Sequence, residues 1–290
     1  MTFAIAEVLA DGAGRITMVA DTKVTVTHNE ALTRQIYTES ACLKIVIVDD
    51  DVVVAFAGDT PESALQHVTG LRGLSADEVL DSLRRYSADH DEELNVSKSF
   101  LIGKRAPDPQ LWRITRGTVE DSRTLQRLWI GEPAAFRAFQ HQYEHVLPGG
   151  PLERRLVHTM QIIVLSEDIP SVGGYATRVS GDATNPFRFH SDPAGSGPWM
   201  TEGFIVEQNG EQVLKMRVPP GGDPSELHRI GVPGRDATFG AMAYFMPEIS
   251  AGLLWTHAEP WRKPIKISGV RTADELVLAG EKDYGQLLEA

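Results

Sequence analysis

Paired strand-like segments alternate with paired helix-like segments along the first 165 residues, and this order constrains the fold. Alternating and β-branched residues predict strands at 2–9, 14–20, 43–48, 52–57, 98–103, 110–115 and 124–130. The first two form a hairpin with a turn at 10–13, a polar stretch at 22–41 follows, and the next two strands form a hairpin at Asp49-Asp50-Asp51. Helical periodicity predicts helices at 60–71, 75–93, 134–146 and 152–165, the second of which starts at the capping box Ser75-Ala76-Asp77-Glu78. The order along the chain is strands, two helices, strands and two helices. This order suits antiparallel sheets covered by helices better than parallel β-α units. We therefore expect an α+β fold with two stacked, mainly antiparallel sheets between helical layers.

The chain becomes β-rich again after residue 171. Strands are predicted at 175–180, 187–190, 237–245, 252–255 and 265–269, with a hairpin at 204–218 that turns at Asn209-Gly210. Residues 219–224 have the composition of a loop, and the capping box Thr272-Ala273-Asp274-Glu275 starts a terminal helix. We expect one domain over residues 1–190 and a β-rich C-terminal extension over residues 191–290.

Composition excludes several classes of protein. A formal net charge of −12 opposes nucleic-acid binding, which depends on neutralising phosphates with Lys and Arg. No apolar stretch approaches the roughly 18 residues that a membrane-spanning helix needs, and the N-terminal residues lack the pattern of a secretory signal. A single cysteine, Cys42, forms no internal disulfide. The expected setting is the cytoplasm, without membrane or nucleic-acid partners.

Thr2 is a candidate nucleophile because removal of Met1 would place it at the N-terminus. A threonine hydroxyl needs an adjacent base, and an N-terminal threonine carries one in its own α-amine, whose reference pKa is about 8. Many cytoplasmic proteins begin with Met-Thr, so this feature alone does not identify a catalyst.

Several further segments resemble the proteasome β-subunit family of N-terminal-nucleophile (Ntn) hydrolases, in that family's order. They are Thr2-Phe3-Ala4-Ile5-Ala6, the stretch 16–25 with Asp21, Lys44-Ile45, Ala55-Phe56-Ala57-Gly58-Asp59, and Asp168-Ile169-Pro170-Ser171-Val172-Gly173-Gly174. The resemblance covers about residues 2–180 and implies the four-layer αββα sandwich of that family. Agreement in five places is far more specific than any one motif.

The resemblance also implies a role for each matching residue. Thr2 would attack a peptide carbonyl while its amine moves the proton, and Lys44, oriented by Asp21, would lower the pKa of the nucleophile. The Gly58 N–H would face the oxyanion, and Asp168 and Ser171 would anchor the Thr2 amine. Relatives imply peptide or unfolded-protein substrates, a homo-oligomeric ring and an ATP-dependent unfoldase. No cofactor or metal is expected.

One departure keeps other functions open. The family usually has Gly-Ser-Gly where this chain has Gly131-Glu132-Pro133, so Glu132 replaces a serine that helps to position the nucleophile. A carboxylate there would raise the pKa of the amine, which would then be protonated at neutral pH and therefore less able to act as a base. The alternatives are a catalytically silent structural subunit or scaffold of the same fold, and an Ntn amidase acting on a small molecule.

Two competing sites receive simpler interpretations. His141 and His145 lie at i and i+4, with Glu144 before the second, as in an inverted zinc-peptidase motif. That site would need a third ligand, and the same residues are typical of a solvated helix face. Cys42 adjoins an apolar strand, so packing is its expected role.

Overall fold

The computed structural model describes most of the chain outside several loops. The described residues are 2–9, 14–24, 41–94, 98–105, 107–121, 126–145, 150–166, 168–191, 193–194, 203–208, 211–216, 229–234, 242–256, 258–259 and 261–288. The predicted turns at 10–13 and 209–210, the loop 219–224 and most of the polar stretch 22–41 fall outside these ranges.

The first sheet combines strands from the start of the chain with strands between residues 127 and 189. Its strands lie in the order β10-β9-β2-β1-β8, all antiparallel, with bounds β1 Phe3–Val8, β2 Ile16–Asp21, β8 Arg127–Gly131, β9 Ala176–Gly181 and β10 Arg188–Phe189. The predicted hairpin of β1 and β2 is confirmed. Because β1 lies between β2 and β8, it is an interior strand of the sheet, and its residues Phe3 to Glu7 are buried.

The second sheet is a simple antiparallel meander. Its order is β3-β4-β5-β6-β7, with bounds β3 Ile45–Asp49, β4 Val52–Gly58, β5 Lys98–Lys104, β6 Gln110–Thr115 and β7 Thr118–Asp121. The predicted hairpin around Asp50 and Asp51 is confirmed, with a register shift between Ile47 and Asp49. Strand β7 is not among the predicted strands; its residues, Thr-Val-Glu-Asp, lack the apolar alternation that marks a half-buried strand.

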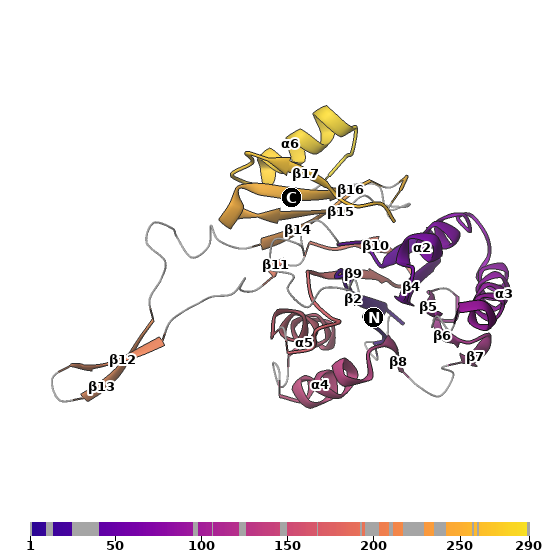
Figure 1. The fold of residues 1–290 in the computed structure, drawn as a ribbon, viewed down its shortest axis with the longest axis horizontal. Coiled ribbons are helices and arrows are strands. Elements are labelled where there is room, and N and C mark those ends of the chain that lie inside the picture. Colours follow the sequence, from indigo (N-terminus) through magenta and orange to yellow (C-terminus); the bar gives the residue numbers. More distant parts are fainter. Residues whose placement is uncertain are drawn as a thin grey trace.

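Helices cover the outer faces of these two sheets. The helices are α2 Pro61–Thr69, α3 Ala76–Leu94, α4 Pro133–Tyr143 and α5 Leu152–Ser166. Apolar residues of α2 and α3 pack on the second sheet, and those of α4 and α5 pack on the first. Figure 1 shows the strands between these two pairs of helices. The predicted α+β class with two antiparallel sheets is confirmed.

Local signals placed the helix starts correctly. In the predicted capping box before α3, the Ser75 hydroxyl donates to Glu78 Oε2 (2.6 Å) and the Glu78 N–H donates back to Ser75 Oγ (3.4 Å). The C-terminal helix α6, Ala273–Tyr284, begins at Thr272, whose hydroxyl oxygen accepts the Glu275 N–H.

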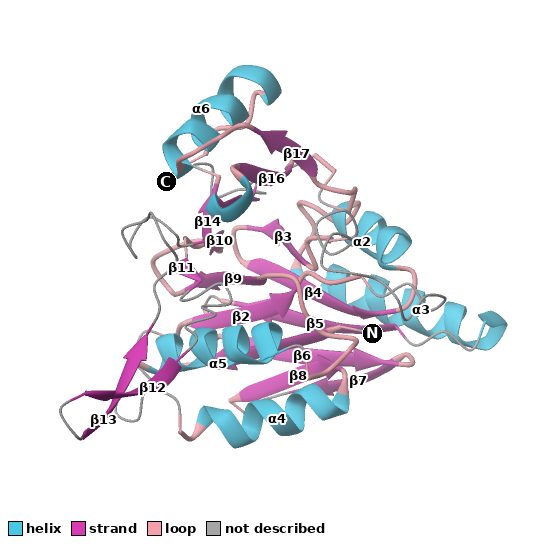
Figure 2. Cartoon of the chain, turned by 60° about the vertical axis from the view of Figure 1, so that its left-hand side comes forward, coloured by secondary structure: helices cyan, strands magenta, loops and turns pink. Residues whose placement is uncertain are grey.

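The C-terminal residues form a third antiparallel sheet beside the first. Its order is β11-β14-β15-β16-β17, with bounds β11 Pro193–Ala194, β14 Arg229–Pro233, β15 Met242–Met246, β16 Ala251–Trp255 and β17 Ile265–Ser268, and a short 3₁₀ helix, η2 Pro247–Ile249, joins β15 to β16. Helix α6 covers it, as Figure 2 shows. The predicted hairpin is present as β12 Gly203–Gln208 with β13 Glu211–Met216, and among the described residues these two strands pair only with each other. Strands β11 and β14 are additions to the predicted set.

One apolar core joins all three five-stranded sheets. It includes Met18 of the first sheet, Leu101 of the second, and Tyr244 and Trp255 of the third. The Tyr175 and Tyr244 rings lie 3.9 Å apart between centroids, and the Tyr175 hydroxyl donates to Met246 Sδ (2.9 Å). The C-terminal sheet therefore packs as part of the same core as the N-terminal sheets. No helix among the described residues is long and apolar enough to cross a membrane.

Candidate active site

Thr2 lies at the start of β1, where the end of β8 holds its backbone. Thr2 is 3% exposed, and its carbonyl oxygen accepts a hydrogen bond from the Glu132 N–H (2.8 Å). Gly131, opposite Phe3, has a φ of 99°, and a Cβ atom there would lie 1.7 Å from the Thr2 carbonyl oxygen. Only glycine fits so close a backbone approach at this φ. The β8 terminus thus fixes the position of residue 2.

Asp21 and Lys44 form a buried ion pair next to Thr2. Asp21, at the end of β2, accepts hydrogen bonds on Oδ1 from the Phe3 N–H (3.0 Å) and from Lys44 Nζ (3.0 Å). Lys44 and Asp21 side chains are 1% and 0% exposed. The same carboxylate oxygen thus holds both the Lys44 ammonium and the backbone that follows Thr2.

The remaining contacts of the pair come from loops. The Gly173 N–H donates to Asp21 Oδ2 (3.2 Å), and Lys44 Nζ also donates to the Lys23 carbonyl. Burial raises the pKa of Asp21 above its usual value, although Lys44 and the two N–H donors oppose that rise. A charge pair withdrawn from water carries a large desolvation penalty and is weak evidence for stability by itself. Its position beside a candidate nucleophile makes it a functional candidate.

Gly58 lies at the end of β4, close to the strands that carry Thr2 and Lys44. Two residues before it, the Phe56 N–H donates to the Lys44 carbonyl (3.0 Å). Ala57, immediately before Gly58, has its Cβ 3.3 Å from where a Gly131 Cβ would lie. Gly58 has a φ of 150°, which favours glycine. Gly58 thus ends a strand that borders both Lys44 and the backbone that holds Thr2.

Ser171 meets Glu132, whereas Asp168 does not join the cluster. The Ser171 hydroxyl donates to Glu132 Oε2 (3.2 Å), and Glu132 Oε1 accepts the Ala134 N–H (3.1 Å) as the N-cap of α4. Asp168 is exposed, and its backbone N–H donates to Ser166 Oγ (3.5 Å). Among the contacts of the described residues, none joins the Asp168 carboxylate to Thr2, Asp21 or Lys44.

Sequence reasoning overlooked the backbone contacts of the site. Gly131 was noted only for its neighbour Glu132, and Gly173 only as part of a motif, yet one holds Thr2 and the other binds Asp21. Thr22 was also missed: its hydroxyl oxygen accepts the Tyr175 N–H (2.9 Å), which joins the end of β2 to the segment after Gly174. Isolated glycines at strand ends were the available signal.

The two competing sites lack the features that catalysis would need. Cys42 is buried, which raises its pKa to about 12, so its thiol is a poor nucleophile, and its predicted packing role is confirmed. The rings of His141, in α4, and His145, beyond the end of that helix, stack at 5.4 Å between centroids, and both residues are exposed. Within the described ranges, no group of three or more His, Cys, Asp or Glu residues could hold a metal ion.

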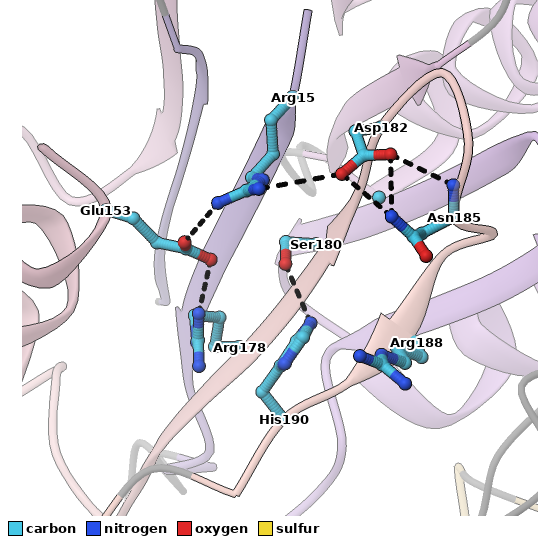
Figure 3. Close-up of a pocket in the computed structure, with 9 residues that line it drawn as sticks. Arg15, Glu153, Arg178, Ser180, Asp182, Asn185, Arg188 and His190 are labelled. Atoms are coloured by element: carbon cyan, nitrogen blue, oxygen red, sulfur yellow. Dashed lines mark hydrogen bonds and ion pairs between the residues drawn. The ribbon is translucent and has the colours of Figure 1, made fainter. Parts of the chain in front are cut away.

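A separate polar cavity of about 250 Å³ lies at the opposite end of β2 from Asp21. Figure 3 shows Glu153 at the start of α5 between Arg15 and Arg178. The Ser180 and His190 side chains are 2.7 Å apart, and burial lowers the pKa of His190 to about 4. Burial raises the pKa of Glu153, but Arg178 and Arg15 lower it below its usual value. These interactions join α5, β2, β9 and β10.

Comparison with known proteins adds a similarity of fold. No family model and no curated protein matches the sequence. Eukaryotic HslV from Trypanosoma brucei is similar in structure, with 15% identity, a TM-score of 0.46, and coverage of 62% of this chain and 99% of HslV. The Gly-1 mutant of Anbu from Hyphomicrobium sp. strain MC1 has 16% identity, a TM-score of 0.48, and coverage of 66% and 86%. Both similarities are similarities of structure at low sequence identity.

Proposed function

We propose that this chain is a proteasome-like threonine peptidase of the Ntn-hydrolase fold, with Thr2 as its nucleophile after removal of Met1. The observation that carries the proposal is the buried Asp21–Lys44 pair, which shares a carboxylate oxygen with the backbone N–H directly after Thr2. A lysine ammonium held this way supplies a fixed positive charge beside an N-terminal hydroxyl and amine. The four-layer sandwich of that fold agrees with the packing of α2 and α3 on one sheet and α4 and α5 on the other.

The reaction would proceed in two steps through an ester. Thr2 Oγ attacks the peptide carbonyl carbon, and its proton passes to the α-amine and then to the leaving amine as the C–N bond breaks. Water then attacks the ester, and its proton returns through the α-amine to Thr2 Oγ as the acid product leaves. The Lys44 charge lowers the pKa of the hydroxyl, which eases loss of its proton, and lowers the pKa of the amine, which keeps the amine unprotonated at neutral pH and helps it to pass the proton to the leaving group.

The remaining residues position the reacting groups. The Gly58 N–H would bind the oxyanion, where one preorganised donor lowers the barrier by about 3–4 kcal/mol. Ser171 would act through Glu132, with which it shares a hydrogen bond, and these two residues would orient the Thr2 amine. Asp168 was proposed for the same task; its exposure requires that a movement of the loop before Ser171 bring it closer.

The proposal includes a substrate class and an assembly. Peptides or unfolded proteins would be hydrolysed in the cytoplasm by a homo-oligomer, a ring or a related arrangement, to which an ATP-dependent unfoldase would deliver them. Residues 1–190 would form the catalytic domain and residues 191–290 the extension. These assignments rest on the family resemblance, which covers about residues 2–180.

Covalent labelling tests the mechanism directly. The purified chain should lack Met1 by N-terminal sequencing, hydrolyse fluorogenic peptides, and be modified on Thr2 by a peptide vinyl sulfone. Thr2→Ala should remove hydrolysis while leaving the melting temperature nearly unchanged, because the side chain serves chemistry more than packing. Retention of most activity in Thr2→Ala would overturn the mechanism. Activity lost on chelation and restored by zinc would move the site to His141 and His145.

A silent structural subunit is the second candidate, and Glu132 favours it. Its carboxylate already binds the Ser171 hydroxyl and caps α4, and its N–H binds the Thr2 carbonyl. A carboxylate near the Thr2 ammonium would keep the amine protonated and weaken it as a base. Retained Met1, together with no turnover of any peptide, would support this function. Glu132→Ser would then be expected to create or raise activity.

A further inference from the structure

A cavity of about 700 Å³ lies between residues of the first 66 positions and the loop that joins β16 to β17 in the C-terminal extension. One wall belongs to the N-terminal domain and includes Val24, Cys42 and Pro61 at the start of α2. The opposite wall is the loop between β16 and β17, with Glu259, Trp261 and Arg262. In Figures 1 and 2 this loop descends from the third sheet toward α2.

The N-terminal wall is built from the segments that hold the Asp21–Lys44 pair. Val24 directly follows Lys23, whose carbonyl accepts a hydrogen bond from Lys44 Nζ. Cys42 lies two residues before Lys44, and its N–H donates to the Thr22 carbonyl (2.9 Å). Pro61 starts α2 three residues after Gly58. Three segments of the cavity wall are thus within three residues of Lys23, Lys44 and Gly58 in sequence, and Lys44 and Gly58 are not themselves among the lining residues.

The cavity wall that belongs to the extension packs against the N-terminal part of the chain. Trp261 is half-buried and packs on the apolar cluster that contains Cys42, Leu65 and Phe56. Within the loop, the Arg262 N–H donates to the Glu259 carbonyl (3.1 Å), and their side chains form an ion pair (2.9 Å). The sheet that carries this loop is anchored by Tyr244 and Met246 on Tyr175.

The cavity's lining indicates what kind of group it would take. Its charged residues are two acids, Glu62 and Glu259, and two bases, Arg262 and Lys263, so their formal charges cancel. Trp261 supplies a large apolar surface between them, and an aromatic ring of this size contributes much of the contact energy in a binding site. The volume is within the range of about 300–1,000 Å³ that is typical of ligand sites.

We propose that the C-terminal extension forms one wall of the substrate cleft and that Trp261 determines specificity there, by binding a large apolar side chain of an extended peptide. This inference rests on the proposed peptidase function for the identity of its ligand. It assigns a role in substrate selection to a part of the chain that lies outside the resemblance to the proteasome family.

Binding to a catalytically inactive chain separates this inference from the proposed reaction. The probes are two fluorescein-labelled, N-acetylated tetrapeptide amides that differ only in having Phe or Gly at the third position. In full-length Thr2→Ala protein, fluorescence anisotropy should show that the Phe peptide binds at least about tenfold more tightly. Adding Trp261→Ala should bring the ratio of the two peptide affinities close to one. Adding Trp261→Phe should preserve much of the preference for the Phe peptide.

Trp129→Ala is the matched control, because Trp129 is a half-buried tryptophan that stacks on Phe136 and does not line this cavity. Trp129→Ala should leave the ratio of the affinities for the Phe and Gly peptides unchanged. Melting curves should show that each variant is folded. An unchanged ratio in Trp261→Ala, or no binding of either peptide to Thr2→Ala, overturns the inference. Selective binding that depends on Trp261, without turnover by the unmodified protein, keeps the inference and rejects the peptidase reaction.

Discussion

At the scale of single residues, Lys44 carries the proposed electrostatic role, and its burial determines how it can be tested. Lys44→Met keeps most of the apolar stem but leaves the Asp21 carboxylate buried without its partner. Breaking such a pair costs about 3–5 kcal/mol of folding free energy. We therefore expect Lys44→Met to lose stability as well as activity, in chemical denaturation and peptide turnover respectively.

A double variant separates these two losses. Lys44→Met with Asp21→Asn removes the unpaired charge and should regain part of the stability. Activity should remain reduced by about a thousandfold, which corresponds to about 4 kcal/mol of transition-state stabilisation. Lys44→Arg should also fail, because a planar guanidinium cannot replace a compact ammonium. Lys23→Met serves as the control for charge removal nearby, and near-normal turnover in the double variant would exclude Lys44 from the mechanism.

Gly131 supports the nucleophile through its lack of a side chain. Gly131→Ala would place a Cβ 1.7 Å from the Thr2 carbonyl oxygen, so the end of β8 or the start of β1 must move. We expect loss of both activity and stability, measured by turnover and melting temperature. Gly73→Ala is the matched control: its φ of 79° is also positive, but no atom lies within 4 Å of the added Cβ. Its expected effect is the backbone strain alone, about 1–2 kcal/mol. Equal effects in the two variants would contradict this account of Gly131.

At the scale of elements, the polar cluster at the far end of β2 should make stability depend on pH. His190, on the strand end after β10, faces Ser180 and the charged groups Arg178, Glu153 and Arg188. The pKa of His190 is lowered from 6.5 to about 4, so between these pH values the unfolded chain binds a proton at His190 and the folded chain does not. The contribution of His190 to the free energy of unfolding is therefore fully present above pH 6.5. It is lost as the pH falls toward 4, by at most about 1.4 kcal/mol per pH unit.

His190→Gln should reduce this acid-side decline. Urea unfolding at several pH values between 7 and about 4 would measure it, since the slope of stability against pH reports the difference in bound protons. His141→Gln, on the exposed face of α4, is the reference for loss of a surface histidine. The same pH slope in His190→Gln and in the unmodified chain would show that His190 does not contribute.

At the scale of the whole molecule, the extension and the N-terminal sheets share one apolar core. Removing residues 191–290 would expose core residues such as Tyr175 and Phe187, which now pack with Tyr244 and Trp255. We expect the truncated chain to aggregate or to melt at a clearly lower temperature, in light scattering and calorimetry. Replacing the hairpin 203–216 by a short Gly-Ser linker is the control, because its two strands pair only with each other. A soluble truncated chain with unchanged melting would show that residues 1–190 fold without the extension.

The sequence by itself determined the local structure and the candidate residues. Alternating apolar residues, capping boxes and turn residues depend on near neighbours, so the hairpins of β1–β2 and β3–β4 and the starts of α3 and α6 were predictable. Thr2, Asp21, Lys44 and Gly58 were found because each lies in a short stretch that resembles one family.

Tertiary structure alone decided which distant segments meet. Gly173 donates to Asp21 across 152 residues of sequence, and Ser171 reaches Glu132 rather than Thr2, whereas Asp168 stays exposed. No periodicity encodes such contacts, because they depend on how sheets stack and where loops close. The same reason explains Trp261: in sequence it is a lone tryptophan in a loop, and only the packing of the third sheet brings it beside Val24 and Cys42.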